Sequence, residues 1–555
     1  MSPPRSDTPT PELSLAQQMH MVQRLCAWLR QRSDSVVERF ETHISVVLVQ
    51  GGHAYKIKKA LANAFLDQST LARRRQACAE ELRLNRRLAA ELYLGVVNIT
   101  GTPDTPELDG PGPVLDVAVK MRAFAQAGLW DRLAARGALE ATHIDALVAA
   151  LAAFHAAATV ADAHSRFGTP QQVRAPMLET LRELAAADLD ADALSTLRQL
   201  ARWEAAAYPQ LAPLMAQRLQ AGHVREGHGD LHLGNVALVD GRCTVFDGIE
   251  FNDDFRWLDT VSELAFMAMD LHAHGLPKLA HRLVNGYLQA CGDYEGVRLL
   301  RYDLIYRALV RAKVGLIRAA QLPAEPAARE RAAALRHIDL ARQFSVAGGA
   351  VCMITHGFSG SGKTTLSQGL LEACGAIRVR ADVERKRLAG LGALASSHSP
   401  VGGGIYNEAM SHATYAQLLA AGRAVLESGW PVILDATYLR RAQRDGARRM
   451  AAACGAPLVV LDCVADATTL AERVRLRVHQ RARRGGDASE ADAQVLAAQM
   501  QSAQPLQADE VGDAFTMPGL GAPASAWEPL RRRISTQREL TRLPSSREPI
   551  STVGT

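Results

Sequence analysis

The chain has 555 residues, of which 48% are hydrophobic and 22% are charged. This composition excludes a wholly disordered chain, a collagen and a small disulfide scaffold, and the length fits two large domains. The 63 basic and 58 acidic side chains leave a net charge of +5, which disfavours a dedicated nucleic-acid binder. Eight cysteines without a CxxC pair, and apolar stretches too short to span a bilayer, predict a cytoplasmic protein without a membrane partner.

The pattern of strands and helices changes along the chain and predicts two domains of different fold. Short strand-like runs at 44–50 and 53–59 meet at Gly51–Gly52, which predicts a hairpin, and helical patterns follow. After Gly349, apolar strands and helices alternate, which predicts a parallel α/β sheet. The predicted segments are a disordered leader (1–15), a first domain (16–322), a helical connector (323–348), a second domain (349–511) and a mostly disordered tail (512–555).

Residues 357–365 of the second domain fit the G-x-x-x-x-G-K-[ST] motif between an apolar strand and a helix. Glycines allow backbone N–H groups to face phosphates, and the helix N-terminus adds positive potential. We expect Lys363 to reach the β- and γ-phosphates of ATP and Thr364 to bind Mg²⁺. The predicted nucleotide-binding residues of this loop are Gly357, Ser359, Gly360, Ser361, Gly362, Lys363, Thr364 and Thr365.

Acidic side chains at strand ends complete the predicted second site. Asp435 ends an apolar strand, where a second Mg²⁺ ligand is expected, although a solvated strand-end Asp gives the same pattern. Asp382 follows the strand after the P-loop helix and is predicted to accept the proton of an acceptor hydroxyl. Arg385 is predicted to bind an anionic group of that acceptor. A charged helix start, with Asp382 as its N-cap, is the alternative.

An arginine-rich run from 473 to 484 is predicted to close over the nucleotide and neutralise transition-state charge. Within it we select Arg481 and Arg484, and the alternative is an ordinary solvated helical face. The second domain thus resembles small P-loop kinases of the gluconate kinase and polynucleotide kinase type and, more distantly, zeta toxins. The spacing of Asp382 and Arg385 looks like the polynucleotide 5′-kinase arrangement.

A separate set of polar residues in the first domain also fits phosphoryl transfer. Asp230 lies in a His-Gly-Asp loop, Asn235 follows five residues later, and Asp247 ends a strand beyond a hairpin. Phosphoryl transfer needs a carboxylate near the attacking hydroxyl and oxygen ligands for Mg²⁺. We therefore expect Asp230 to be the base, and Asn235 and Asp247 to bind the metal.

This loop resembles that of the aminoglycoside phosphotransferase and choline kinase group, and the resemblance extends over residues 20–320. It implies an α+β protein-kinase-like first domain, followed here by an α/β P-loop NTPase domain with a parallel sheet. The resemblance implies that Lys58, directly after an apolar residue, holds phosphate and that Glu81 is its ion-pair partner. It also implies that Asp259 braces the catalytic loop and that residues 42–45, rather than the glycine pair, lie nearer the phosphates.

Together the two halves are similar to bacterial two-domain proteins with an aminoglycoside phosphotransferase-like domain and a P-loop ATP-binding domain. The leading hypothesis is a bifunctional kinase that uses ATP and Mg²⁺ to phosphorylate hydroxyl groups of small molecules at both sites. One alternative is a regulatory module in which the P-loop domain senses nucleotide and gates the first domain. Another is a nucleic-acid end kinase in the second half, against which the small net charge counts.

Overall fold

The computed structural model groups the chain into two compact units: residues 1–177 with 212–270, and residues 178–211 with 271–555. Helices α5, α6 and α8 cross the boundaries between the units. The residues described are 12–32, 36–62, 66–346, 348–397, 399, 403–484, 488–517, 528–530 and 532, with the backbone alone for 480–484. Most of the predicted leader and tail therefore lies outside the described residues.

The first unit is built on a six-stranded antiparallel sheet of order β1-β2-β3-β6-β4-β5. The predicted hairpin is confirmed, because β2 pairs with β3 around the turn at Gly51–Gly52. The strands of this sheet are β1 (Glu38–Glu41), β2 (Ser45–Gln50), β3 (His53–Lys58), β4 (Tyr93–Thr102), β5 (Thr105–Leu108) and β6 (Val114–Arg122).

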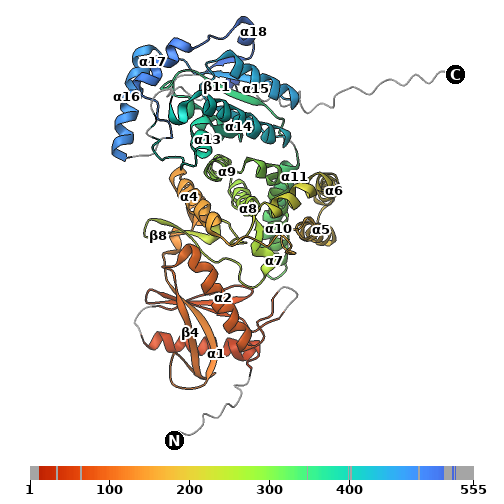
Figure 1. The fold of residues 1–555 in the computed structure, drawn as a ribbon. Coiled ribbons are helices and arrows are strands. Elements are labelled where there is room, and N and C mark those ends of the chain that lie inside the picture. The colour runs from red at the N-terminus through yellow and green to blue at the C-terminus, as the bar shows by residue number, and fades with distance from the viewer. Residues whose placement is uncertain are drawn as a thin grey trace, which may run out of the picture. The chain divides into compact units, whose positions relative to one another are not determined.

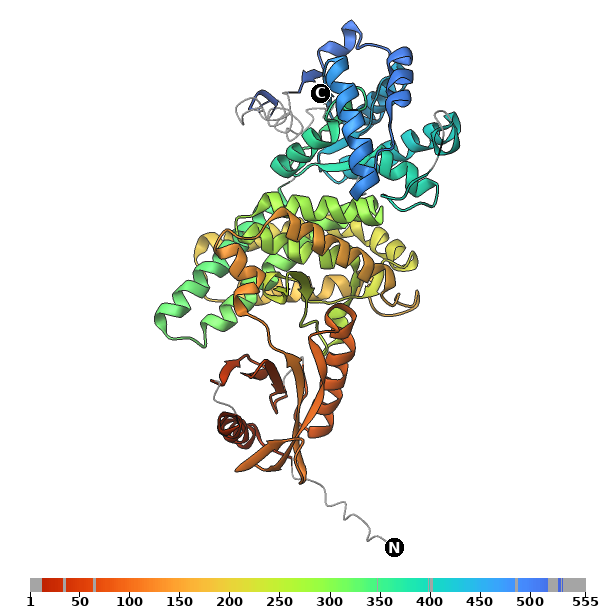
Figure 2. The same cartoon turned by 90° about the vertical axis from the view of Figure 1, so that its left-hand side faces the viewer.

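Two helices cover this sheet. Helix α2 (Leu71–Ala89) packs against β4 and β6, as Figures 1 and 2 show, and its buried Cys78 joins a core that includes Val117 and Val119. Helix α1 (Leu15–Gln31) begins at the N-cap Ser14 and buries an apolar stripe beneath β2 and β3. The sheet and α2 together hold the side chains that the sequence predicts for phosphate binding.

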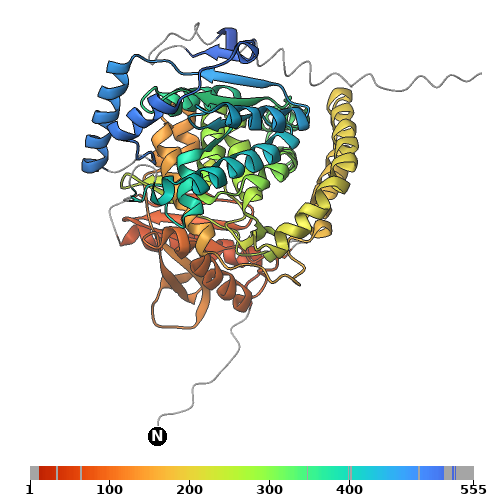
Figure 3. The same cartoon turned by 45° about the horizontal axis from the view of Figure 1, so that its top comes forward.

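The rest of the first unit carries the predicted catalytic loop between short paired strands. Strand β7 (Val224–Glu226) pairs with β10 (Trp257–Asp259), and β8 (Val236–Val239) pairs with β9 (Arg242–Val245). The helices of this region, with α6 the long yellow helix of Figure 3, are α3 (Trp130–Ala135), α4 (Ala141–Ala157), α5 (Pro170–Ala186), α6 (Ala191–Gln220), α7 (Asp253–Arg256) and α8 (Thr260–Ala273).

The second unit contains a helical part and a parallel sheet. Helices α9 (Pro277–Cys291), α10 (Val297–Ala319) and α11 (Ala324–Ser345) form the helical part, and α10 packs along α11. The sheet has the order β12-β13-β11-β14-β15, and its strands are β11 (Cys352–His356), β12 (Ile377–Arg380), β13 (Val432–Asp435), β14 (Leu458–Asp462) and β15 (Ala514–Thr516).

Helices cover both faces of this parallel sheet, so its central strands are almost continuously buried. Strand β15 lies in the segment predicted to be mostly disordered and adds a fifth strand beside β14. The helices are α12 (Lys363–Cys374), α13 (Ala381–Leu388), α14 (Glu408–Glu427), α15 (Arg441–Ala453), α16 (Ala467–Arg484), α17 (Ala493–Ser502) and α18 (Ala508–Val511).

Both predicted folds are confirmed: an antiparallel kinase-like sheet with helices, and a parallel sheet typical of P-loop proteins. Among the described residues, no helix combines the length and the apolar character that crossing a membrane requires.

Candidate active sites

The predicted catalytic loop of the first unit runs from His228 to Asn235, after β7. Gly229 has φ 85°, and a Cβ at this position would lie 2.8 Å from the carbonyl oxygen of Phe255, so the loop needs glycine there. The Nδ2 of Asn235 donates to the backbone oxygen of Asp230 at 2.9 Å and to its carboxylate at 3.0 Å. The loop thus holds the predicted base beside one predicted metal ligand.

A buried glutamate that the sequence analysis missed, Glu263 of α8, braces this loop. Its Oε1 accepts the backbone N–H groups of His228 at 2.6 Å and Gly229 at 2.8 Å, and its Oε2 lies 2.6 Å from Nε2 of His155. Burial raises the pKa of Glu263, but the hydrogen bond from His155 and the nearby positive charge lower it to about 2. The bracing role expected for Asp259 stays a prediction; in the structure its carboxylate accepts from the guanidinium of Arg218 at 2.7 and 2.9 Å.

Two lysines of β3 share one glutamate of α2. The Nζ of Lys56 lies 2.9 Å from Oε1 of Glu81, and the Nζ of Lys58 lies 2.6 Å from Oε2. Lys56 also pairs with Asp247, and Lys58 with the buried Glu250. Burial raises the pKa of Glu81, but the two ammonium groups lower it to about 2. Burial lowers the pKa of Lys58, but Glu250 and Glu81 raise it above its usual range.

A cavity of about 480 Å³ lies over this network, and Lys56, Asn235 and Asp247 line it. Its wall also includes Thr42, from the turn between β1 and β2, Ser45 at the start of β2, and the end of β6 with the segment that follows. Lys58 is 1% exposed and lies behind the wall, against Glu250. Of the two lysines that alternation places on one face, Lys56 therefore contacts the cavity.

The P-loop of the second unit follows β11 and opens α12. Gly357 has φ 139°, and a Cβ there would lie 2.5 Å from the carbonyl oxygen of Cys463. The Nζ of Lys363 donates to the backbone oxygens of Gly357 at 3.0 Å and Phe358 at 2.7 Å, and burial lowers its pKa. The buried Oγ of Ser361 has no hydrogen-bond partner among the described residues. The loop thus surrounds its own lysine, and the Ser361 hydroxyl is left as an unused hydrogen-bond donor. Both features suit the binding of a phosphate group.

A cavity of about 500 Å³ opens at the carboxyl edge of the parallel sheet, in front of this loop. In doubly wound sheets, ligands bind at this edge. Most of the residues predicted for the second site line it: Ser359, Gly360, Gly362, Lys363, Thr364, Thr365, Asp382, Arg385 and Asp435.

The two acids predicted for this site differ in their surroundings. Asp435 ends β13, is buried, and accepts hydroxyl groups of Thr355 and Ser367 at 3.4 Å each. Asp382 lies in the first turn of α13 and is half-buried. A buried carboxylate fixed by two hydroxyl groups suits metal binding, whereas the more exposed carboxylate of Asp382 suits proton transfer.

Other residues of this site were missed in the sequence. Gln499 of α17 accepts the backbone N–H of Ser359 at 2.9 Å and donates to its hydroxyl at 3.0 Å. Arg473 and Arg477 of α16 line the cavity, one helical turn apart. The arginine-rich run was the right signal for these two. The side chains of Arg481 and Arg484, the pair selected from the sequence, lie outside the described part of the chain.

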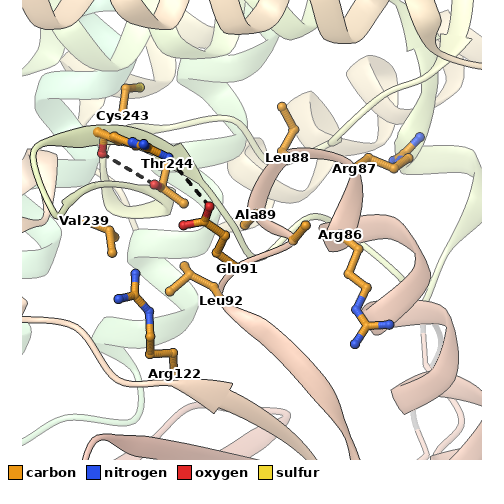
Figure 4. Close-up of a pocket in the computed structure, with 12 residues that line it drawn as sticks. Arg86, Arg87, Leu88, Ala89, Glu91, Leu92, Arg122, Val239, Cys243 and Thr244 are labelled. Atoms are coloured by element: carbon orange, nitrogen blue, oxygen red, sulfur yellow. Dashed lines mark hydrogen bonds and ion pairs between the residues drawn. The ribbon is translucent and has the colours of Figure 1, made fainter.

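Another cavity of the first unit, about 280 Å³, lies at the end of α2 and is drawn in Figure 4. It has several arginines, but they have protein partners: Arg86 donates to the backbone oxygens of Tyr93 and Leu94, and Arg122 pairs with Asp240. Arg86 points away from the other labelled side chains in Figure 4. We therefore assign this cavity no catalytic role.

Both main cavities fit Mg²⁺ chemistry. Among the described residues, no group of three or more His, Cys, Asp or Glu side chains is arranged to hold a metal by itself. Mg²⁺ in kinases needs fewer protein ligands, because it takes one or two from the protein and others from phosphates. Asn235 and Asp247 line the first cavity, and Thr364 and Asp435 line the second, so each offers two oxygen donors.

Comparisons with known proteins agree with this two-part architecture. A model of the phosphotransferase enzyme family matches residues 45–300, and a model of an AAA domain matches residues 353–506. The chain therefore combines a kinase-like phosphotransferase domain with a P-loop domain, and the two matches suggest a phosphotransferase that uses ATP.

An uncharacterized protein of Mycobacterium tuberculosis is 32% identical over 461 residues, which cover 82% of this chain and 88% of the relative. An uncharacterized protein of Mycobacterium bovis gives the same values. The chain belongs to the family of these mycobacterial proteins.

Solved structures with more distant likeness correspond to the two parts of the chain. A choline/ethanolamine kinase family protein from Mesorhizobium loti covers 60% of this chain and 100% of its own, with 14% identity and a TM-score of 0.35. A gluconokinase from Sinorhizobium meliloti covers 35% of this chain and 94% of its own, with 21% identity and a TM-score of 0.23.

Proposed function

We propose that the protein is a bifunctional ATP-dependent kinase, in which each domain transfers the γ-phosphate of ATP to a hydroxyl group of a small molecule. One observation carries the proposal. Each of two separate cavities brings together a lysine, two oxygen ligands suited to Mg²⁺ and a further acid at or beside its wall. These are the groups that phosphoryl transfer needs, because catalysis there is mostly positioning and charge stabilisation.

At the first site, Lys56 holds the ATP phosphates and is itself oriented by Glu81. Mg²⁺, bound by Asn235 and Asp247, would neutralise charge on the β- and γ-phosphates. Asp230 accepts the proton of the acceptor hydroxyl as its oxygen bonds to the γ-phosphorus. The bond from that phosphorus to the bridging oxygen breaks, and ADP leaves with the electron pair.

At the second site, the loop N–H groups and Lys363 hold the phosphates, and Thr364 and Asp435 supply the metal ligands. Asp382 accepts the acceptor proton, and Arg385 binds an anionic group of the acceptor. Arg473 and Arg477, which line the cavity, neutralise charge that develops on the γ-phosphate. The acceptor oxygen gains the phosphoryl group and ADP leaves, as at the first site.

A regulatory role for the P-loop domain is the second candidate, and contacts within the second unit favour it. Asn285 of α9 accepts the backbone N–H of Arg378 at 2.7 Å and donates to the carbonyl oxygen of Ala376 at 2.9 Å. The hydroxyl of Tyr294 donates to Glu384 at 3.3 Å, on the helix that also carries Asp382. Residues inside the phosphotransferase match thus contact elements of the P-loop site, which is the connection that gating requires.

The experiment that tests the proposal is transfer of labelled phosphate from ATP to a cell metabolite extract, with products identified by mass spectrometry. Wild type should yield two classes of product. Asp230→Asn should lose one class, and Lys363→Ala should lose the other. A Lys363→Ala variant that makes both products at wild-type levels would exclude catalysis by the second site. A Lys363→Ala variant that loses both would favour the regulatory candidate.

A further inference from the structure

A groove between α14 and α15 adjoins the P-loop cavity in the second unit and has a volume of about 730 Å³. We call it the α14–α15 groove. From α14 it is lined by Glu408, Ser411, His412, Tyr415, Ala416 and Leu419, which follow one face of the helix. From α15 it is lined by Ala442, Gln443, Gly446 and Arg449, again on one face, and α17 closes a further side.

The groove continues from the cavity where phosphoryl transfer is proposed. The two hollows share part of their lining: Arg385, Tyr406, Tyr415, Thr437, Val495 and Gln499. The stretch of α14 from 408 to 419 spans about 16 Å at 1.5 Å per residue. A molecule with its hydroxyl near Asp382 therefore has room to extend along the groove, well beyond the size of one sugar ring.

Arg385 lies at the junction and is a buried cation without a carboxylate partner among the described residues. It is 9% exposed, and its guanidinium donates to the carbonyl oxygen of Ile405 and to the hydroxyl of Ser411, each at 3.2 Å. The guanidinium carbon lies 5.2 Å from the ring centre of Tyr406, and Nε is buried with no partner in the described chain. A buried charge of this kind is costly unless an anion pairs with it.

Two further arginines line the groove from α15: Arg440 directly precedes the helix, and Arg449 lies in its later half. Neither forms an ion pair with a described carboxylate, and Glu408 is the one acid among the described lining residues. Arginine recognises phosphate and carboxylate groups in bidentate fashion. The groove lining thus carries an excess of positive charge, with three arginines against one glutamate.

We propose that the α14–α15 groove binds the acceptor of the P-loop site and that this acceptor is a small phosphorylated alcohol. One anionic group pairs with Arg385 near the point of transfer, and the second lies along α15, where Arg440 and Arg449 supply the positive charge. The proposal rests on the kinase function proposed above for the second site. It adds the class of the acceptor and a second anion-binding position.

Calorimetric binding tests the groove separately from catalysis. The full-length Asp230→Asn variant is saturated with Mg²⁺ and a non-hydrolysable ATP analogue, so that neither site can turn over and the P-loop is filled. Glucose, glucose 6-phosphate, fructose 1,6-bisphosphate and a ten-nucleotide RNA with a 5′-hydroxyl are then titrated. We expect no binding of glucose, binding of the monophosphate, and tighter binding of the bisphosphate. Arg440→Ala with Arg449→Ala should weaken the bisphosphate about tenfold or more and the monophosphate less.

The control is Arg423→Ala, an exposed arginine of α14 outside the groove lining, which should leave both affinities within about twofold. Equal binding of glucose and its phosphates, or no effect of the double substitution, would overturn the proposal. Binding of RNA alone would overturn the small-molecule class. Wild type is then incubated with ATP and the ligands that bind. Phosphate-dependent binding in the titration without phosphoryl transfer in this assay would keep the groove and reject catalysis, so the two failures are distinguishable.

Discussion

The two candidate sites differ in how the chain assembles them. At the P-loop site, nine consecutive residues form the phosphate cradle, and Lys363 is held by carbonyl groups of its own loop. At the kinase-like site, the lysines come from β3, their shared partner Glu81 from α2, and Asp247 and Glu250 from a loop about 190 residues further on. The P-loop site is therefore local in the sequence, whereas the kinase-like site forms only when the whole first unit is folded.

The two sites should also respond differently when one charged side chain is removed. In the kinase-like site, Glu81 neutralises two buried ammonium groups, so its removal leaves both lysines under-compensated. In the P-loop site, Lys363 contacts neutral backbone oxygens, and among the described residues no chain of ion pairs depends on it. A single substitution should therefore unfold or distort the first site while the second loses function alone.

The largest expected effect is on chemistry. Asp382→Asn should lower phosphoryl transfer at the P-loop site by about 10²–10⁴, because a lost general base costs this much, with ATP affinity kept within a few-fold. Transfer at the kinase-like site should be unchanged, and Asp230→Asn should give the reciprocal result. Single-turnover transfer with labelled ATP measures both, and an Asp382→Asn variant with wild-type transfer would place the base elsewhere.

Glu81→Gln should destabilise the first unit by about 3–5 kcal/mol, the usual cost of breaking a buried ion pair on one side. Glu91→Gln is the control, because this glutamate just beyond α2 is 75% exposed and its ion pair with the exposed Arg242 should contribute less than about 1 kcal/mol. Denaturant unfolding followed by tryptophan fluorescence, to which the buried Trp130 of the first unit contributes, measures the change. Equal effects of the two substitutions would contradict the network.

The same glutamate predicts an acid dependence of stability. The pKa of Glu81 is lowered to about 2, since the lysines outweigh the effect of burial, so the folded state favours the ionised form. Its contribution should be present above about pH 4.3, the unfolded value, and lost as the pH falls towards 2. The free energy of unfolding should fall less between about pH 4.3 and 2 in Glu81→Gln than in wild type, because the variant has no titrating group at this position.

The local site was the easier one to predict from sequence, and the reason is physical. A nine-residue motif fixes its own geometry, so Lys363, Thr364 and the sheet-edge acids Asp382 and Asp435 all line one cavity. The run of arginines indicated the right helix. Which arginines point into the cavity depends on how α16 packs, so the sequence did not single out Arg473 and Arg477.

At the distributed site, strand alternation placed Lys56 and Lys58 on one face but did not decide which lies at the cavity. The outcome depends on Glu250, which is far from Lys58 in the sequence but pairs with it inside the folded unit. The residue that braces the catalytic loop likewise depends on contacts that the sequence does not show. Glu263, one turn further along the chain than Asp259, accepts N–H groups of the loop, and no motif in the sequence indicates that contact.

The two lysines can be separated by experiment. Lys56→Met should weaken ATP binding at the kinase-like site about 10- to 100-fold, because a charge-assisted phosphate contact is lost. Lys58→Met should leave that affinity within a few-fold when the unit is folded and instead lower its stability, because Glu250 loses its partner. Nucleotide titration and thermal unfolding of both variants provide the comparison, and a reversed pattern would restore Lys58 as the phosphate ligand.

The smallest expected effect concerns the edge of the parallel sheet. Asn285→Ala should cost about 1–3 kcal/mol of stability in the second unit, because the buried N–H of Arg378 and carbonyl of Ala376 lose their partner. Arg282→Ala, which removes a partly exposed ion pair with Glu372 of α12, should cost less than about 1 kcal/mol. Unfolding of the two variants side by side checks the difference, and an Asn285→Ala variant as stable as wild type would contradict it.

Nucleotide stoichiometry tests the central claim of two independent phosphate sites most directly. Titration of the full-length chain with Mg²⁺ and a non-hydrolysable ATP analogue should give two nucleotides per chain. Lys363→Ala should give one, with the affinity of the remaining site unchanged. A wild-type stoichiometry of one at saturation, or a Lys363→Ala variant that still binds two, would contradict the account.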